Sequence, residues 1–79
     1  MFYVYIIECR DKTLYTGWTN NLEKRIETHN LGLGAKYTRN RLPVVLMYHE
    51  IFNNKIDAQK REYAIKQLSR GHKLAIINK

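Results

Sequence analysis

The chain has 79 residues, which is too few for two independently folded domains, so we expect a single domain over residues 1–79. Hydrophobic residues make up 44% and charged residues 27% of the chain, as in ordinary soluble globular proteins. Lysine and arginine number 14 against 7 aspartate and glutamate residues, which gives a formal net charge of +7. This excess favours a polyanionic partner such as nucleic acid, although a merely basic soluble protein would have the same composition.

The cysteine content and the longest apolar runs exclude several classes of protein. Cys9 is the single cysteine, so no intramolecular disulfide and no cysteine metal cage can form, and we expect it to be a small buried side chain. The apolar run over residues 2–7 is too short for a signal peptide or a membrane span. We therefore expect a cytoplasmic protein that does not enter the membrane.

The first strand is predicted over residues 2–7, which are dense in β-branched and aromatic side chains. Alternation along a strand places Val4 and Ile6 on one face and Tyr5 and Ile7 on the other. Because both faces are apolar or aromatic, we expect this strand to be central in its sheet or covered on both sides.

A β-hairpin is predicted next. Residues 9–12 form a polar turn, and residues 13–16 resume an extended pattern. The pairing brings Tyr5 and Tyr15 into the same neighbourhood, but the sequence does not fix its register.

The first helix is predicted to begin at Asn20, where Glu23 three residues later completes a capping-box pattern. Four side chains of this helix share one face because they recur at i, i+3, i+4 and i+7: Leu22, Arg25, Ile26 and His29. An arginine within an apolar stripe either extends its head into solvent or needs an anionic partner. We interpret this face as one that looks across a shallow groove at a phosphate.

The rest of the chain predicts one more strand and one more long helix. Residues 31–35 contain two glycines that can end the first helix, and residues 44–51 read as a third strand. A second helix is predicted over residues 56–70, ended by Gly71, and residues 74–77 either return as a short strand or pack down. The order β-β-α-β-α predicts an α+β fold, with a small three-stranded antiparallel sheet flanked by helices.

Several short motifs now form an ordered set. The hairpin carries Tyr3-Val4-Tyr5 and Tyr15-Thr16-Gly17, followed by Arg25 and, much later, by Glu62. This set resembles the GIY-YIG nuclease superfamily, which is named for two strand motifs of this spacing. The run H-N-x-G-x-G-A-K-Y-T-R over residues 29–39 is similar to the small bacterial single-domain members, and the resemblance covers essentially the whole chain.

The resemblance implies a metal-dependent endonuclease that hydrolyses DNA phosphodiester bonds, is selective for structure or damage, and serves DNA repair or recombination. By position, Arg25 would clamp phosphate oxygens, and Tyr15 would be the general base, which requires nearby cations that favour the phenolate. Tyr5 and His29 would orient the water or Tyr15, and His29 could itself be the base. Glu62 would hold one Mg²⁺ or Mn²⁺.

Each of these residues also has a purely structural interpretation. Tyr5 and Tyr15 could be core aromatics of the hairpin. His29 could be a surface or capping residue. Glu62 lies beside the packing stripe of its helix, where it can face the sheet, but it could also form a surface pair with Lys66 at i+4.

The sequence departs from the resemblance at Trp18. This residue follows Gly17 at the position where the excision-repair incision nuclease of the superfamily has a lysine, so one cation is missing from the pocket. The alternative function is therefore a nucleic-acid-binding module of the same fold with little or no catalysis. A third interpretation is an adaptor that docks on a larger repair or recombination protein.

A basic segment with an aromatic residue inside it is the candidate nucleic-acid-binding loop: Lys36, Tyr37, Thr38, Arg39 and Arg41. Phosphate contacts from such a loop give affinity without sequence readout. We expect DNA as the partner. The sequence leaves RNA, a larger repair or recombination protein and the oligomeric state open.

Overall fold

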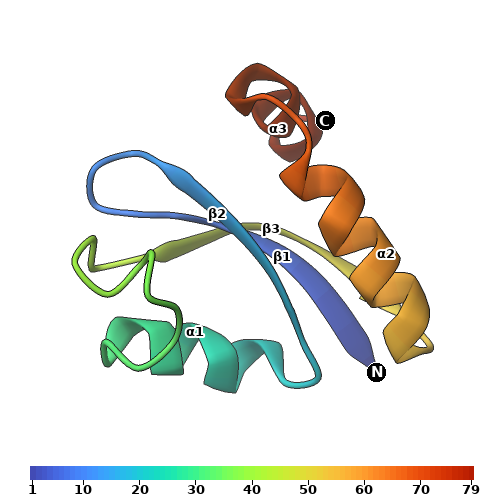
Figure 1. Ribbon diagram of the computed structural model, residues 1–79, viewed down its shortest axis with the longest axis horizontal. Helices are drawn as coiled ribbons and strands as arrows, with labels where there is room; N and C mark the ends of the chain where they lie inside the picture. The colour runs from blue at the N-terminus through green and yellow to red at the C-terminus, as the bar shows by residue number, and fades with distance from the viewer.

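The computed structural model describes residues 1–79, which form a three-stranded sheet held between helices (Figure 1). None of the helices has the length and apolarity that crossing a bilayer requires. In chain order the elements are β1 (Phe2–Glu8), β2 (Leu14–Thr19), α1 (Leu22–Asn30), β3 (Val45–Phe52), α2 (Lys55–Lys66) and α3 (Arg70–Ile77).

The sheet has the order β2-β1-β3, and both pairings are antiparallel. The prediction of an α+β fold around a small antiparallel sheet is confirmed, and so is the central position of the first strand. The register pairs Tyr5 with Gly17 and Ile7 with Tyr15. Because β2 pairs only with β1, its other side is a free edge of the sheet.

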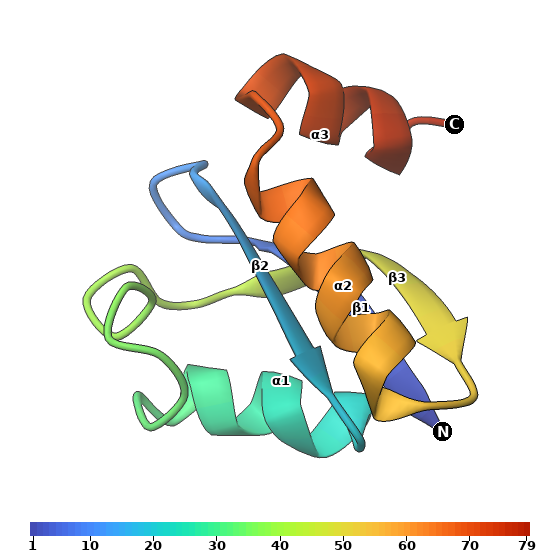
Figure 2. The same cartoon turned by 45° about the vertical axis from the view of Figure 1, so that its right-hand side comes forward.

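The pleat of β1 sends alternate side chains into two hydrophobic clusters, one on each face of the sheet. Val4 and Ile6 pack with Ala58 and Ile65 of α2. The opposite face carries the cluster of Tyr5, Ile7, Cys9 and Val44, against which Leu22 and Ile26 of α1 pack. Figure 2 shows α2 lying across one face of the sheet, while α1 runs along the other. The predicted burial of Cys9 is confirmed, since only 2% of it is exposed.

The first helix begins one residue later than the predicted cap. Asn21 is the N-cap, and its side chain accepts a hydrogen bond from the backbone amide of Lys24. Asn20 lies outside the helix, in the turn that leaves β2. The shift does not change which side chains face the sheet.

The C-terminal prediction was wrong in two respects. The helix predicted over residues 56–70 ends at Lys66, and a separate helix, α3, begins at Arg70, so Gly71 lies inside a helix rather than ending one. The reason is Ser69, whose hydroxyl accepts a hydrogen bond from the amide of His72 and starts the new helix. The tail is therefore helical, and Ile76 and Ile77 pack against the cluster on the α2 face of the sheet.

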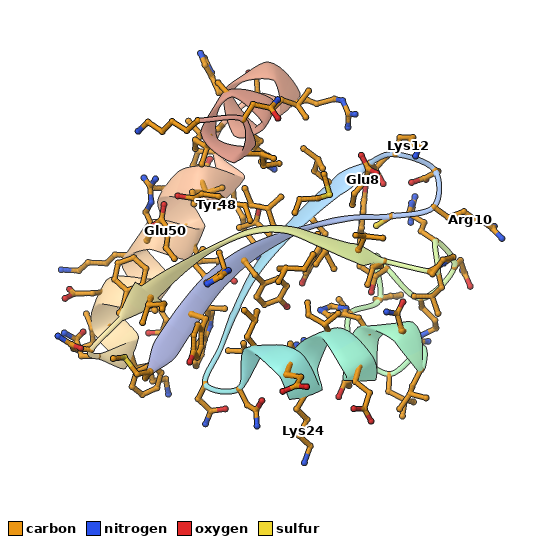
Figure 3. All side chains as sticks on the ribbon, turned by 180° about the vertical axis from the view of Figure 1, so that it is seen from behind. Glu8, Arg10, Lys12, Lys24, Tyr48 and Glu50 are labelled. Carbon is orange, nitrogen blue, oxygen red and sulfur yellow. The ribbon has the colours of Figure 1, made fainter.

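Arg61 connects α2 to the edge strand β3. Its Nε and Nη2 donate to the two carboxylate oxygens of Glu50 at 2.9 and 3.0 Å, and the Tyr48 hydroxyl donates to the same carboxylate. In Figure 3 Tyr48 and Glu50 lie on β3 beside α2. A bidentate pair of this kind fixes orientation as well as adding energy, so it adds to the packing of Ala58 and Ile65 in holding α2 on the sheet.

Two isoleucines of α2 allow a matched test of how this helix packs on the sheet. Ile65 is fully buried, whereas Ile56 is 63% exposed. We expect Ile65→Ala to lower the free energy of unfolding by about 2–5 kcal/mol, because it removes buried atoms and leaves a cavity. Ile56→Ala is expected to change it by less than about 0.5 kcal/mol. Urea denaturation of both variants measures this, and equal losses would contradict the placement of α2.

Candidate active site

The candidate catalytic residues gather beside the free edge of β2, where α1 and α2 approach from opposite faces of the sheet. Leu22 and Ile26 pack into the cluster beneath α1, which turns Arg25 and His29 toward Tyr5. The predicted shared face of this helix is therefore the face that builds the site.

A buried hydrogen-bond network lies at the centre of the site. His29 has no exposed surface, and its Nε2 lies 2.8 Å from the hydroxyl of Tyr5, which is 1% exposed. On the other side of the ring, Nδ1 lies 2.9 Å from the hydroxyl of Thr38. That hydroxyl is also 3.1 Å from the carbonyl oxygen of Ala35.

The network itself assigns the protons. A threonine hydroxyl has one proton, and Thr38 donates it to the carbonyl of Ala35, so Nδ1 of His29 donates to Thr38. A neutral ring then accepts at Nε2, where Tyr5 donates its hydroxyl proton. Burial lowers the pKa of His29 to about 4, and the charge of Arg25 acts in the same direction. His29 is therefore neutral near pH 7, with both nitrogens engaged.

Arg25 connects this buried network to the surface. Its Nε donates to the Tyr5 hydroxyl at 3.3 Å, and its guanidinium forms no ion pair with a carboxylate. The side chain is half-buried. Because the Tyr5 hydroxyl fixes one nitrogen, the remaining donors of the guanidinium are free for an incoming anion.

Tyr15 is the half-exposed tyrosine of the site. Its ring meets that of His29 edge-on, with centroids 5.6 Å apart, and stacks on Tyr37 with centroids 5.8 Å apart. The guanidinium of Arg41 covers the ring of Tyr37 at 4.2 Å. The basic loop is thus joined to the site through stacked rings.

Glu62 is brought to the same place from α2. It pairs with Lys66 at 3.5 Å, which is the i+4 geometry considered above, and the Lys66 ammonium lies 5.8 Å from the centre of the Tyr15 ring. Burial raises the pKa of Tyr5, Arg25 opposes the rise, and the charges of Tyr15 and Glu62 add to it. Glu62 is thus linked through Lys66 to the ring of Tyr15, which in turn meets the ring of His29.

The site offers one carboxylate to a metal ion. No group of three histidine, cysteine or acidic side chains is arranged to hold one. The Glu62 side chain is 19% exposed and has Lys66 as its ionic partner. A single carboxylate suits Mg²⁺, which keeps several waters and takes substrate phosphates as its other ligands. The donor set therefore fits a cation that is completed by the substrate.

The predicted nucleic-acid-binding loop divides into exposed and engaged side chains. Lys36 and Arg39 are exposed and form no ion pair. Arg41 donates to Asp11 at 3.0 Å and to the carbonyl of Tyr37. Thr38 differs from the expectation of a direct nucleic-acid contact, because it is fully buried and its hydroxyl holds His29.

Two glycines have a packing role in the site that the sequence did not predict, since Gly17 was placed in a strand motif and Gly34 among the residues that can end the first helix. A Cβ on Gly17 would overlap the hydroxyl end of Tyr5, and one on Gly34 would overlap the ring of His29. The signal in the sequence was the position of Gly17 on the strand that pairs with the Tyr5 strand. The role of Thr38 left no comparable signal.

Adding a methyl group at either glycine tests this close packing. We expect Gly17→Ala and Gly34→Ala each to lower the free energy of unfolding by about 1–3 kcal/mol, because a buried ring must shift. Gly71→Ala in α3 is the control, since its nearest outside atom is Ser69 Oγ at 3.9 Å, and it should be neutral or stabilising. Thermal unfolding distinguishes the three, and an unchanged Gly34→Ala would contradict the described contact.

The neutral His29 predicts a pH dependence of stability. An unfolded chain binds a proton at histidine near pH 6.5, whereas folded His29 binds it only near pH 4. The free energy of unfolding should therefore fall by up to about 3 kcal/mol as pH drops from about 6.5 to about 4. His29→Gln removes the titration but keeps a hydrogen-bonding side chain. Denaturant unfolding at several pH values should show a shallower acid loss in this variant, and equal losses would contradict a buried neutral ring.

The sequence has close relatives. It is 64% identical over 78 residues to a UPF0213 protein of Clostridium perfringens, a match that covers 99% of this chain and 84% of that one. It is 59% identical over 75 residues to a UPF0213 protein of Staphylococcus haemolyticus, covering 95% of this chain and 92% of the relative.

The fold and the family agree with these relatives. The solution NMR structure of a UPF0213 protein from Bacillus halodurans is similar with a TM-score of 0.64 and 44% identity, covering 99% of this chain and 84% of that one. Residues 1–75 match the family described as the GIY-YIG catalytic domain. The chain, which is similar to UPF0213 proteins over nearly its whole length, therefore belongs to the GIY-YIG catalytic domain family.

Proposed function

We propose that this protein is a metal-dependent endonuclease that hydrolyses DNA phosphodiester bonds. The GIY-YIG catalytic domain family points to nuclease activity and a nucleic-acid substrate. The observation that carries the proposal is the Arg25 guanidinium, which the buried Tyr5–His29 pair holds at the surface with no carboxylate partner. A guanidinium held in this way is suited to a phosphate group that arrives from solution.

Arg25 is the proposed phosphate clamp. Its free nitrogens would donate to the nonbridging oxygens of the scissile phosphate, where charge shifts as water attacks in line and the sugar oxygen leaves. Tyr5 touches Arg25 and His29 rather than solvent, so we assign both Tyr5 and His29 as positioning residues. With both ring nitrogens engaged, His29 is not our choice of base.

Tyr15 is the proposed general base, because it is the half-exposed phenol of the site and its ring lies near the ammonium of Lys66, the ionic partner of Glu62. The new bond forms between the water oxygen and phosphorus while the ionised oxygen of Tyr15 takes the water proton, and the bond to the sugar oxygen breaks, with that oxygen taking a proton from solvent. Stacking on Tyr37 and the edge-on contact with His29 fix the plane of its ring. A fixed ring keeps the oxygen aimed without an entropy cost at each turnover.

Glu62 is the proposed metal-binding residue. A bound Mg²⁺ or Mn²⁺ would neutralise charge on the phosphate and on the leaving oxygen. Lys66 holds Glu62 in the absence of the cation and would have to release it. If it did not, the same surface would bind nucleic acid without cutting it, so this pair favours the alternative of a binding module.

The basic surface determines the substrate class. Lys36 and Arg39 are exposed cations of the loop that carries Tyr37, and such groups contact backbone phosphates rather than base edges. We therefore propose a substrate that is selected by structure or damage, as in DNA repair or recombination, rather than by a defined sequence.

Nicking of supercoiled DNA tests the proposal. With Mg²⁺ or Mn²⁺ we expect nicking that EDTA abolishes, and a rate loss of at least about 100-fold for both Arg25→Ala and Glu62→Gln. Glu27→Gln, an exposed carboxylate of α1, is the control for the charge change and should nick normally. Circular dichroism checks that every variant is folded. Salt-sensitive DNA binding without nicking would overturn the endonuclease proposal in favour of a nucleic-acid-binding module.

A further inference from the structure

A groove lies beside the site, at the end of β2 where the strand leaves the sheet. It has a volume of about 280 Å³ and is lined by Phe2, Trp18, Thr19, Asn20, Arg25 and Lys55. Since ligand pockets for whole small molecules occupy about 300–1,000 Å³, this groove suits a single flat ring with its attached charge. It shares Arg25 with the site, so whatever fills it lies next to the scissile phosphate.

The groove carries positive charge without any acidic lining residue. Lys55 and Arg25 are its two cations, and neither takes part in the four ion pairs of the molecule. Elsewhere Lys66, Arg61, Arg41 and Lys12 each have a carboxylate partner. Two unpaired cations facing one groove attract an anionic group with at least two free oxygens.

The wall of the groove is aromatic. The ring of Trp18 lies 6.4 Å from that of Phe2, tilted by 48°, and the Lys55 ammonium sits 5.5 Å from the centre of the indole. Trp18 is half-exposed. A half-exposed aromatic ring beside unpaired cations is the combination that binds single-stranded nucleic acid, because every base has a face that can stack.

We propose that this groove binds the nucleotide adjacent to the scissile phosphate, with its phosphate between Lys55 and Arg25 and its base on Trp18. The proposal rests on the nuclease function proposed above and adds the position of the neighbouring nucleotide. It also requires an unpaired base at that position, because a base stacked in a duplex cannot reach the ring. Trp18 and Lys55 would thereby select substrates in which the bases next to the cleavage site are unpaired, such as single strands or the open ends of a branched duplex.

The protein contains its own reporter, since Trp18 is the single tryptophan. We would titrate a fluorescein-labelled single-stranded thymidine tetramer in EDTA, following binding by anisotropy and the groove by tryptophan emission. Saturating quenching of Trp18 is expected with the tetramer. A tetramer of abasic sites, which keeps the phosphates and lacks the bases, should bind without that quenching.

Two lysine variants distinguish binding in the groove from a general effect of the protein's net charge. Lys55→Met should raise the Kd about 3- to 10-fold and reduce the salt slope by about one phosphate contact. Lys24→Met loses the same charge from α1, where the side chain points away from the sheet (Figure 3), and should change the Kd less than twofold. Equal effects of the two variants, or tight binding without quenching, would overturn the proposal.

The outcome is separable from that of the nuclease proposal. If the protein nicks DNA with metal but Trp18 fluorescence is not quenched, the nuclease proposal holds and the proposed nucleotide binding in the groove is wrong. If quenching depends on Lys55 but the protein does not nick DNA, the groove binds nucleotides as proposed and the nuclease proposal is wrong.

Discussion

The hydrogen bond between Tyr5 and His29 is the interaction on which the site depends. It joins the central strand to α1 in the interior, and both partners are excluded from solvent. A buried polar pair is stable only when every donor and acceptor is satisfied. Thr38 completes the pair on the side of the basic loop, and Arg25 completes it on the side of the groove. The pair thus holds three segments together beside β2: the central strand β1, the helix α1 and the basic loop that contains Thr38.

The elements of the fold could be predicted from the sequence because their patterns were strong. Alternation in residues 2–7 indicated a strand covered on both faces, and the spacing from Leu22 to His29 identified the inner face of α1. The break between α2 and α3 was not predicted. Gly71 looked like a helix stop, but the Ser69 cap places it inside the last helix, where a glycine is tolerated.

The positions of the site residues were less predictable than their identities. A motif gave Tyr5 and Tyr15 together, but only the register and the pleat show that one is buried and the other half-exposed. Thr38 lay within a basic run and was interpreted with it, since no local pattern marks a residue whose partner is nine positions away. In the sequence, Trp18 stands where a related nuclease has a lysine, which suggested that the site lacks one positive charge. In the fold, however, the ammonium of Lys55 from α2 lies near the Trp18 ring. Contacts between distant segments carry no signal in a single sequence.

Paramagnetic relaxation by Mn²⁺ tests most directly whether Tyr15, Arg25 and Glu62 surround one phosphate. Amide spectra of the ¹⁵N-labelled protein would be recorded with a non-cleavable oligonucleotide and substoichiometric Mn²⁺. The account predicts broadening that is confined to residues around Glu62 and the middle of β2 and that requires the oligonucleotide for full effect. Broadening centred on another acidic residue, such as Asp11 in the hairpin turn, would contradict it.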